Sequence, residues 1–508
     1  MNLYKKIGIQ YKCAFFSALV FGLISQGMGM FNKFSWHDDA VCLFSVGTTF
    51  ASGRWMLGFL EQLDMLLFGS QPTSLPLTNG LVSLLMLGLS ACLFIALLKI
   101  THPAASCFVG GTMAAFPAIT GLFGFVFTLP YYVFGILLAS AGAYLICRGK
   151  NLLLRIAGIP LITMSIGIYQ AYFSVALCGI LFYFIAYGME EAKSTGEFIG
   201  KGLLAALALV ISMLLYFLCT NLSLTLYHTA LNDYMGIDQM GKSSISVYLE
   251  RVLYAYRVFF SQDASKPYYM YARTSRRVYL VIALLSLAAS PVLILRHFRR
   301  NKVNAVLSLV LVCLIPLAAN FVFVMADPND VHSLMTYGQV YIFVYFAWVI
   351  DRIQFRKERL QQAVRGVGLA LLLLINIMFF RYDNQCYLKA ALSQQEAISY
   401  FTTMVTQIKS AEGYDDRFSI YVVNDFQNQD ETITHFGNLD HVTQHPYGGL
   451  SDYLNNYNWK YFVRNWCGFS PDWKNGDELL HLPEVQNMTH YPDDGSIRVI
   501  DDKVVIRF

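Results

Sequence analysis

The chain has 508 residues, of which 56% are hydrophobic and 14% are charged. Soluble domains average roughly 25% charged residues, so this composition excludes a large soluble core and indicates an integral membrane protein. The formal net charge of +4 is small and gives no indication of nucleic-acid binding. In chain order, apolar segments of membrane-spanning length, about 20 residues, are predicted near 12–31, 78–98, 104–120, 125–147, 156–170, 171–189, 200–220, 278–295, 303–325, 335–350 and 366–382.

The distribution of lysine and arginine orients these predicted spans. Basic loops lie near 148–155, 193–201, 296–302 and 352–365, whereas the short loops near 121–124 and 326–334 contain neither residue type. Cytoplasmic loops are enriched in lysine and arginine, so we expect the N-terminus in the cytoplasm. With the N-terminus inside, the polar regions 32–77 and about 222–277 are expected outside. Because the number of predicted spans is odd, the tail from 383 is expected outside as well.

The tail differs in character from the rest of the chain, because it contains no long apolar run. Residues 391–409 have the pattern of an amphipathic helix, 419–423 that of a strand, and 497–500 with 504–508 that of a hairpin around Asp501 and Asp502. We therefore expect two domains. Residues 1–382 are predicted to form an all-α polytopic membrane domain of about eleven transmembrane helices, with outer loops 32–77 and 222–277. Residues 383–508 are predicted to form a small extracytoplasmic α/β domain, where Cys386 and Cys467 could pair.

The predicted spans contain almost no charge, which confines ionisable groups able to do chemistry to the loops. Trp36, His37, Asp38 and Asp39 lie at the start of the first outer loop. Asp38 or Asp39 could act as a general base or acid toward a substrate at the membrane surface. The alternative is a solvated loop in which an aspartate caps the next helix. Adjacent carboxylates also repel, so the pair could share a proton or a cation.

A basic residue follows in the same loop. The run Ser52–Trp55 precedes residues 56–68, which are predicted to form a short helix lying on the membrane face. Arg54 could hold a lipid phosphate with its planar guanidinium. Alternatively, Arg54 and Trp55 could anchor the chain among lipid headgroups.

A polar tip joins the fifth and sixth predicted spans. It consists of Tyr169, Gln170, Ala171 and Tyr172. These side chains could form hydrogen bonds with sugar hydroxyls, or they could belong to the aromatic belt found at bilayer interfaces.

The second outer region carries basic residues between tyrosines, against the cytoplasmic bias of such residues. Arg257 and Lys266 are among them. A phosphate or diphosphate ligand would explain their position, and contact with anionic lipid or loop packing is the alternative. Asp327, Asp330 and His332 could line the same cavity, although Asp-Pro-Asn-Asp is also a turn signal.

The tail contains three histidines that suggest a metal site only superficially. His435, His441 and His445 match no closed zinc site. We therefore assign no metal ligand.

Taken together, the Asp38–Asp39 pair, the Ser52–Trp55 run and the Tyr169–Tyr172 tip resemble the Gtr type II family of bacterial glucosyltransferases, which are polytopic enzymes that modify O-antigen. The stretch Tyr491–Ile497, which leads into the terminal hairpin, is similar to that family's C-terminal ending. The resemblance covers essentially the whole chain. It implies a GT-C-like fold, the wider class of glycosyltransferases with polyprenyl-phosphate sugar donors, and a place in the bacterial cytoplasmic (inner) membrane.

The resemblance also implies a mechanism. A polyprenyl-phosphate hexose, expected to be glucose, would give its sugar to a cell-surface glycan whose hydroxyl is deprotonated by Asp38 or Asp39. Arg54, with Arg257 or Lys266, would stabilise the departing phosphate, and the anomeric configuration would invert.

The remaining assignments concern the substrate contacts and the cofactor. Trp36 and His37, with Tyr169, Gln170 and Tyr172, are assigned to sugar or acceptor contact. A diphosphate-linked donor would call for a divalent cation, Mg²⁺ or Mn²⁺, whereas a monophosphate donor need not.

Two rival hypotheses remain. The first is a transporter or flippase for a lipid-linked sugar, and the second is a non-catalytic partner in polysaccharide assembly. Transporters often carry charges within their spans and inverted repeats, and the sequence shows neither.

Overall fold

The computed structural model describes residues 7–232, 243–296, 301–426, 439–443 and 449–508 and divides into two compact units. Unit 1 comprises Met1–Asn32 and Phe44–Asn384, and unit 2 comprises Lys33–Leu43 and Gln385–Phe508. The division after Asn384 lies close to the expected boundary at 382. The segment Lys33–Leu43 differs from expectation, because it groups with the tail and not with the membrane helices. His435 and His445 lie outside the described residues.

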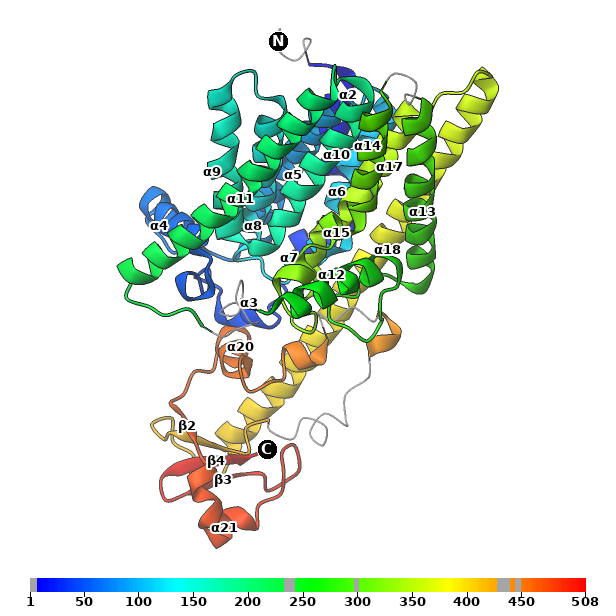
Figure 1. Cartoon of the computed structure of the whole chain (residues 1–508). Coiled ribbons are helices and arrows are strands. Elements are labelled where there is room, and N and C mark those ends of the chain that lie inside the picture. The colour runs from blue at the N-terminus through cyan, green and yellow to red at the C-terminus, as the bar shows by residue number, and fades with distance from the viewer. Residues whose placement is uncertain (1–6, 233–242, 297–300, 427–438, 444–448) are drawn as a thin grey trace. The chain divides into compact units, whose positions relative to one another are not determined.

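Unit 1 is a bundle of helices (Figure 1). The helices of unit 1 are α2 (Ile9–Phe31), α4 (Trp55–Phe68), α5 (Pro76–Leu98), α6 (Pro103–Ala115), α7 (Pro117–Phe123), α8 (Leu129–Arg148), α9 (Leu152–Ile168), α10 (Phe173–Glu190), α11 (Thr195–Leu226), α12 (Ile245–Phe260), α13 (Arg273–Arg296), α14 (Lys302–Cys313), α15 (Ile315–Ala319), α16 (Val322–Met325) and α17 (Tyr341–Arg352), with the 3₁₀ helices η1 (Phe50–Ser52), η2 (Gln170–Tyr172) and η4 (Ser333–Val340). Helix α18 (Glu358–Ser410) begins in unit 1 and continues into unit 2.

Each of the eleven predicted spans coincides with helical structure. Among the described residues, nine helical segments are long and apolar enough to cross a membrane, and α9 and α14 are shorter apolar helices. Helix α14 is short because it is interrupted at Leu314, and α15 begins at Ile315 with Pro316 in its first turn. The chain is therefore a mostly helical, multi-pass membrane protein.

Close helix contacts in unit 1 depend on small residues. Helix α2 packs against α5 and α6. A Cβ atom added to Gly110 of α6 would lie 1.8 Å from the carbonyl oxygen of Ala14 in α2, so only glycine permits this approach.

Two helices of unit 1 carry outward-facing apolar side chains and lie at the end of the bundle away from the N-terminus (Figure 1). Helix α4 confirms the helix predicted at 56–68 and exposes Leu66, Leu67 and Phe68. Helix α12 exposes Ile245 and Leu253, which are 81% and 70% accessible. Both helices therefore present apolar surface of the kind that lies against lipid.

Unit 2 contains a four-stranded sheet with the order β2-β1-β4-β3. Its strands are β1 (Ile420–Val423), β2 (Trp473–Asn475), β3 (Ile497–Ile500) and β4 (Lys503–Arg507). The predicted strand and hairpin are confirmed, and Asp501 and Asp502 both have positive φ angles, 46° and 59°, as a tight hairpin turn requires. Strand β1 pairs in parallel with both β2 and β4.

The remaining helical elements of unit 2 are short. They are α3 (Asp38–Val41), η5 (Leu439–His441), η6 (Leu450–Asp452), α20 (Trp459–Trp466), η7 (Asp477–His481) and α21 (Pro483–Gln486). Buried apolar residues that include Val423, Leu479 and Val505 form a core on the sheet. Cys386 and Cys467 are free thiols and do not form the disulfide considered from the sequence.

Candidate functional site

Asp39 is sequestered in unit 2. Its carboxylate forms an ion pair with the ammonium group of Lys33 and accepts a hydrogen bond of 3.0 Å from Ser35 Oγ. The side chain of Asp39 is 1% exposed and that of Lys33 is 24% exposed. Burial lowers the pKa of Lys33, and the charge and hydrogen bond of Asp39 oppose this shift. The pair is therefore a buried electrostatic contact with little access to a substrate.

Asp38 differs from its neighbour because it is accessible. Its side chain is 29% exposed, and Oδ1 lies 2.9 Å from Nδ1 of His37. This hydrogen bond raises the pKa of His37, with smaller contributions from the charges of Asp38 and Asp452 and with burial opposing. His37 has φ 45° and ψ −123°, a conformation that costs a non-glycine residue on the order of 1–3 kcal/mol. Backbone strain therefore lies next to the accessible carboxylate.

The rest of unit 2 holds this strained segment in place. His37 N donates to the carbonyl of Asp452 at 2.9 Å, and Asn458 Nδ2 donates to the carbonyl of His37 at 3.1 Å. Asn465 Nδ2 donates to the carbonyl of Ala40 at 3.0 Å. The loop that carries Asp38 is thus positioned by residues more than 400 positions later in the chain.

The start of the same segment is fixed to α18. Ser35 N donates to Gln394 Oε1 at 3.0 Å, and Gln394 Nε2 donates to the carbonyl of Lys33 at 3.1 Å. Trp36 is 1% exposed and stacks on Phe34 with ring centroids 6.3 Å apart. Trp36, which the sequence assigned to sugar contact, lies in the interior of unit 2.

In unit 1, the Ser52–Trp55 run of the first outer loop contacts the Tyr169–Tyr172 tip. Gln170 Nε2 donates to the carbonyl of Ser52 and to Tyr216 Oη, both at 3.0 Å. Gly53 has φ 68°, and a Cβ atom there would lie 2.7 Å from Tyr216 Oη. This close approach explains why the position before Arg54 is glycine.

Arg54 is held by aromatic side chains. Its Nη1 donates to Tyr132 Oη at 3.1 Å, and its guanidinium carbon lies 5.2 Å from the ring centroid of Tyr169. Tyr132 and Tyr169 stack with centroids 4.7 Å apart. Tyr169, Gln170 and Tyr172 are 4%, 9% and 0% exposed, so the hairpin tip is buried in unit 1. Its predicted contact with sugar stays a prediction.

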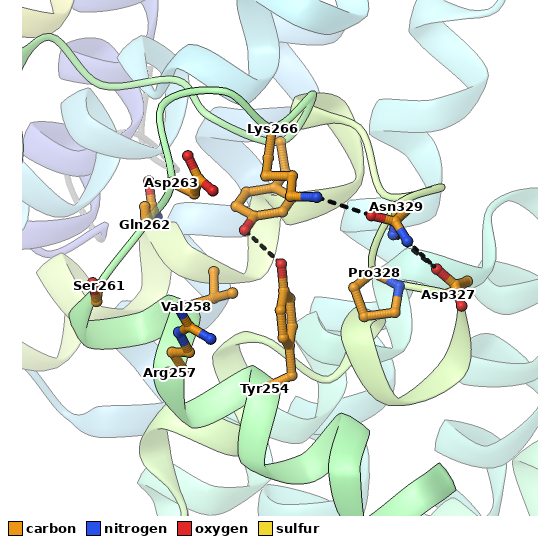
Figure 2. Close-up of a pocket in the computed structure, with 11 residues that line it drawn as sticks. Tyr254, Arg257, Val258, Ser261, Gln262, Asp263, Lys266, Asp327, Pro328 and Asn329 are labelled. Carbon is orange, nitrogen blue, oxygen red and sulfur yellow. Dashed lines mark hydrogen bonds between the residues drawn. The ribbon is translucent and has the colours of Figure 1, made fainter.

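Arg257 and Lys266 line one cavity of unit 1 with a volume of about 570 Å³ (Figure 2). Its walls come from the end of α12, the loop that follows it and the loop before η4. The lining residues are Tyr254, Arg257, Val258, Ser261, Gln262, Asp263, Lys266, Tyr268, Asp327, Pro328 and Asn329. Small-molecule sites usually enclose roughly 300–1,000 Å³, so this cavity has the size of a binding site.

The cavity lining combines both charge signs with neutral polar groups. Lys266 Nζ donates to Asn329 Oδ1 at 3.0 Å, a hydrogen bond drawn as a dashed line in Figure 2. The hydroxyls of Tyr254 and Tyr268 lie 2.8 Å apart. Hydrogen bonds from the backbone and side chain of Ser265 lower the pKa of Asp263, which keeps this carboxylate ionised. Two cations and two carboxylates, those of Asp263 and Asp327, therefore face one space.

Several residues of the site were not found from the sequence. Tyr132 and Tyr216 lie inside apolar helices, and Lys33 lies six residues from its partner Asp39, so none belongs to a local motif. Asp327 lines the cavity as expected, whereas Asp330 and His332 are absent from its lining. In the part of the chain that the structure describes, no group of three or more His, Cys, Asp or Glu residues could hold a metal ion.

Comparison with known proteins identifies the family. A family model described as glucosyl transferase GtrII matches residues 27–343, well over half of the chain. The matched range contains the Asp38–Asp39 pair, Arg54, the hairpin tip and the cavity residues, and it ends before the tail. Comparison with curated proteins and with solved structures finds no match. The chain belongs to the GtrII family of glucosyl transferases, and it is therefore a multi-pass membrane glucosyltransferase of a kind that acts on surface glycans.

Proposed function

We propose that this glucosyltransferase moves glucose from a polyprenyl-phosphate donor to a cell-surface glycan at the outer face of the bacterial cytoplasmic membrane. The observation that carries the proposal is the cavity of unit 1, in which Arg257 and Lys266 face Asp263, Asp327 and Asn329. In this orientation, the N-terminus is cytoplasmic and unit 2 is extracytoplasmic, as the loop charges favour.

The mixed lining suits a sugar phosphate better than a bare phosphate. Arg257 and Lys266 supply cationic donors that suit phosphate oxygens. Carboxylate and amide oxygens of Asp263, Asp327 and Asn329 are acceptors for sugar hydroxyls. A bare anion would be repelled by the two carboxylates, whereas a hexosyl phosphate offers hydroxyls to them and a phosphate to the cations.

Helix α12 offers a path for the lipid tail. Ile245, Leu249 and Leu253 recur every four residues and are 81%, 61% and 70% exposed, so they form an apolar stripe on one side of the helix. Tyr254 and Arg257, in the following turn, line the cavity. A prenyl chain can lie along the stripe while its phosphate reaches Arg257 and Lys266.

Asp38 is the proposed general base, and Asp39 positions it. Asp38 is the more accessible carboxylate of the pair, whereas Asp39 is committed to Lys33 and Ser35. A base must reach the proton it removes, so accessibility favours Asp38. In its unprotonated form, His37 leaves Asp38 free of a competing positive charge.

The reaction is a direct displacement. The acceptor hydroxyl gives its proton to Asp38 as its oxygen forms a bond to the anomeric carbon, and the bond from that carbon to the phosphate oxygen breaks. The electron pair leaves with the phosphate, whose charge Arg257 and Lys266 stabilise. Attack opposite the leaving group inverts the anomeric configuration. A phosphate leaving group needs no strong general acid, so a base and a cationic clamp suffice.

Arg54 is a second proposed contact to the donor. Tyr132 and Tyr169 restrict its guanidinium, which preorganises its planar face. We rank Arg54 behind Arg257 and Lys266 because those two residues share a cavity of ligand size.

The experiment tests donor use directly. The purified full-length protein in nanodiscs is given polyprenyl-phosphate glucose and envelope polysaccharide from its own host. We expect transfer with inversion. A hydrogen bond to a charged group contributes about 1.5–3 kcal/mol, so Arg257→Gln and Lys266→Gln should each raise the donor KM by roughly 10-fold or more. The control Arg277→Gln alters an exposed cation of α13 that does not line the cavity, and should change little. Transfer from nucleotide-linked glucose but not from the lipid donor would contradict the proposal.

A further inference from the structure

We propose that an exposed stripe of unit 2, formed by Tyr457, Tyr461 and Arg464, binds the acceptor glycan and presents its hydroxyl to Asp38. This inference rests on the proposed function and adds to it the binding surface for the acceptor. The family match ends at residue 343, so it assigns nothing to this part of the chain.

The stripe is the unburied side of a short amphipathic element. Helix α20 buries Trp459, Phe462 and Val463, each of which is 0% exposed. Tyr461 and Arg464 lie on the exposed side of the helix, three residues apart, and Tyr457 precedes the helix by two residues. The guanidinium carbon of Arg464 lies 5.6 Å from the ring centroid of Tyr461, so these two side chains form one continuous surface.

The exposure of these tyrosines is unusual for unit 2. Tyr457 is 52% exposed and Tyr461 is 42% exposed. In the described residues of unit 2, every other phenylalanine, tyrosine and tryptophan side chain is buried or partly buried. Tyrosine and arginine are enriched at protein-binding surfaces relative to the rest of the protein surface, so their joint exposure is typical of a binding surface.

The stripe begins at the proposed base. The ring of His37 lies against that of Tyr457, with centroids 5.6 Å apart, and His37 hydrogen-bonds to Asp38. Hydrogen bonds from Asn458 to His37 and from Asn465 to Ala40 tie both ends of α20 to the segment that carries Asp38. A ligand on the stripe is therefore held at a fixed position relative to Asp38.

The chemistry of the stripe fits an extended sugar chain. Carbohydrate C–H groups carry partial positive charge and stack on the negative face of an aromatic ring. Tyr461 lies in the first turn of α20, four positions after Tyr457, which lies in the turn before the helix. The two rings can each stack on a sugar of the chain, and Arg464 can donate hydrogen bonds to its hydroxyls. An apolar lipid chain would make no use of the donors of Arg464.

The test measures glycan binding without any donor. Full-length protein in nanodiscs of zwitterionic lipid is titrated with polysaccharide released from the host envelope and freed of its lipid, and the Kd is determined by calorimetry. We expect the double variant Tyr457→Ala/Tyr461→Ala to bind at least 10-fold more weakly than wild type. Tyr457→Phe/Tyr461→Phe keeps both rings and should bind within threefold. Tyr414→Ala, which removes a partly exposed tyrosine after α18, is the control and should bind as wild type.

A transfer assay adds a second readout. Stacking on the acceptor predicts a higher KM for polysaccharide in the alanine double variant, with kcat and the hydrolysis of donor by water unchanged. Equal polysaccharide affinity in wild type and the alanine variant, or no binding by wild type, overturns the inference. The inference is also overturned if the alanine double variant loses binding to anionic vesicles while its affinity for polysaccharide is unchanged, because the stripe would then be a membrane contact. Since no donor is present in the titration, its result stands whether or not the proposed donor is correct.

Discussion

Asp38 and Asp39 are adjacent in the sequence, but we expect their replacement to have opposite effects on activity and stability. Asp38→Asn removes an accessible carboxylate whose partner His37 is itself 44% exposed, and exposed pairs contribute about 0–1 kcal/mol to stability. Loss of a general base lowers the rate by about 10²–10⁴-fold. Asp38→Asn should therefore lose transfer while its melting temperature stays close to that of wild type.

Asp39→Asn should instead destabilise unit 2. Removing one partner of a buried ion pair costs about 3–5 kcal/mol because the other charge is left unpaired. Lys33 is 24% exposed and regains some hydration, so the lower end, about 3 kcal/mol, applies. A loss of this size lowers the melting temperature by roughly 6–12 °C. Lys33→Met combined with Asp39→Asn removes both charges and should recover most of the lost stability.

The assay pairs transfer rates with thermal unfolding of the four proteins in the same nanodiscs, at a temperature where each is folded. The reasoning is refuted if Asp39→Asn abolishes transfer at unchanged stability while Asp38→Asn remains active, because Asp39 would then be the base. Equal stability of Asp39→Asn and the Lys33→Met/Asp39→Asn double variant would show that the unpaired charge of Lys33 does not cause the loss, and equal stability of Asp39→Asn and wild type would show that the pair contributes nothing to folding.

Four further predictions concern His37, Gly53 and the tail. Protonated His37 pairs with Asp38 and competes with the acceptor hydroxyl for its carboxylate, so transfer should rise with pH through the elevated pKa of His37, and His37→Asn should remove this limb of the pH–rate profile. The His37–Asp38 pair should also make stability depend on pH, because the pKa of His37 is higher in the folded state. Its contribution to stability is fully present below the unfolded-state pKa of His37 and is lost as pH rises through the folded-state pKa. Thermal unfolding against pH, with His37→Asn as the reference, measures this contribution. Gly53→Ala places a Cβ atom 2.7 Å from Tyr216 Oη on a residue whose φ is 68°. We therefore expect the free energy of unfolding to fall by about 1–3 kcal/mol and donor binding through Arg54 to weaken. An unchanged melting temperature would contradict the packing described. Removal of residues from 385 onward deletes the hydrogen bonds that Gln394, Asp452, Asn458 and Asn465 make with the segment Lys33–Leu43. It should therefore abolish transfer to polysaccharide while donor binding, measured by equilibrium titration, is retained. Transfer at the wild-type rate would refute this role.

The helices were predictable because membrane spans are set by a local property. A run of about 20 apolar residues is sufficient to identify a span, and each predicted segment is helical in the structure. The terminal hairpin was also predictable, because Asp501 and Asp502 tolerate the positive φ angles that its turn requires. Strand β2 was missed since Trp473–Asn475 is too short to show an alternating pattern, and it forms by pairing with β1, more than 50 residues earlier.

The candidate site was predictable in its motifs but not in its contacts. Asp38, Arg54, Arg257 and Lys266 stand out because they are charged residues in a chain with few charges. Their partners carry no such signal. Tyr216 lies in a long apolar helix, and the grouping of Lys33–Leu43 with the tail depends on hydrogen bonds to residues far along the chain, such as Asp452. Contacts of this range are set by tertiary packing, which local patterns do not encode.

The most direct test of the proposed reaction uses proteoliposomes that hold the purified protein and labelled polyprenyl-phosphate glucose, with host polysaccharide added outside. The proposal predicts that the label appears in the polysaccharide with inverted anomeric configuration, and that Asp38→Asn loses at least 99% of this transfer. Movement of the labelled lipid across the bilayer with no label in the polysaccharide would show a flippase and would contradict it.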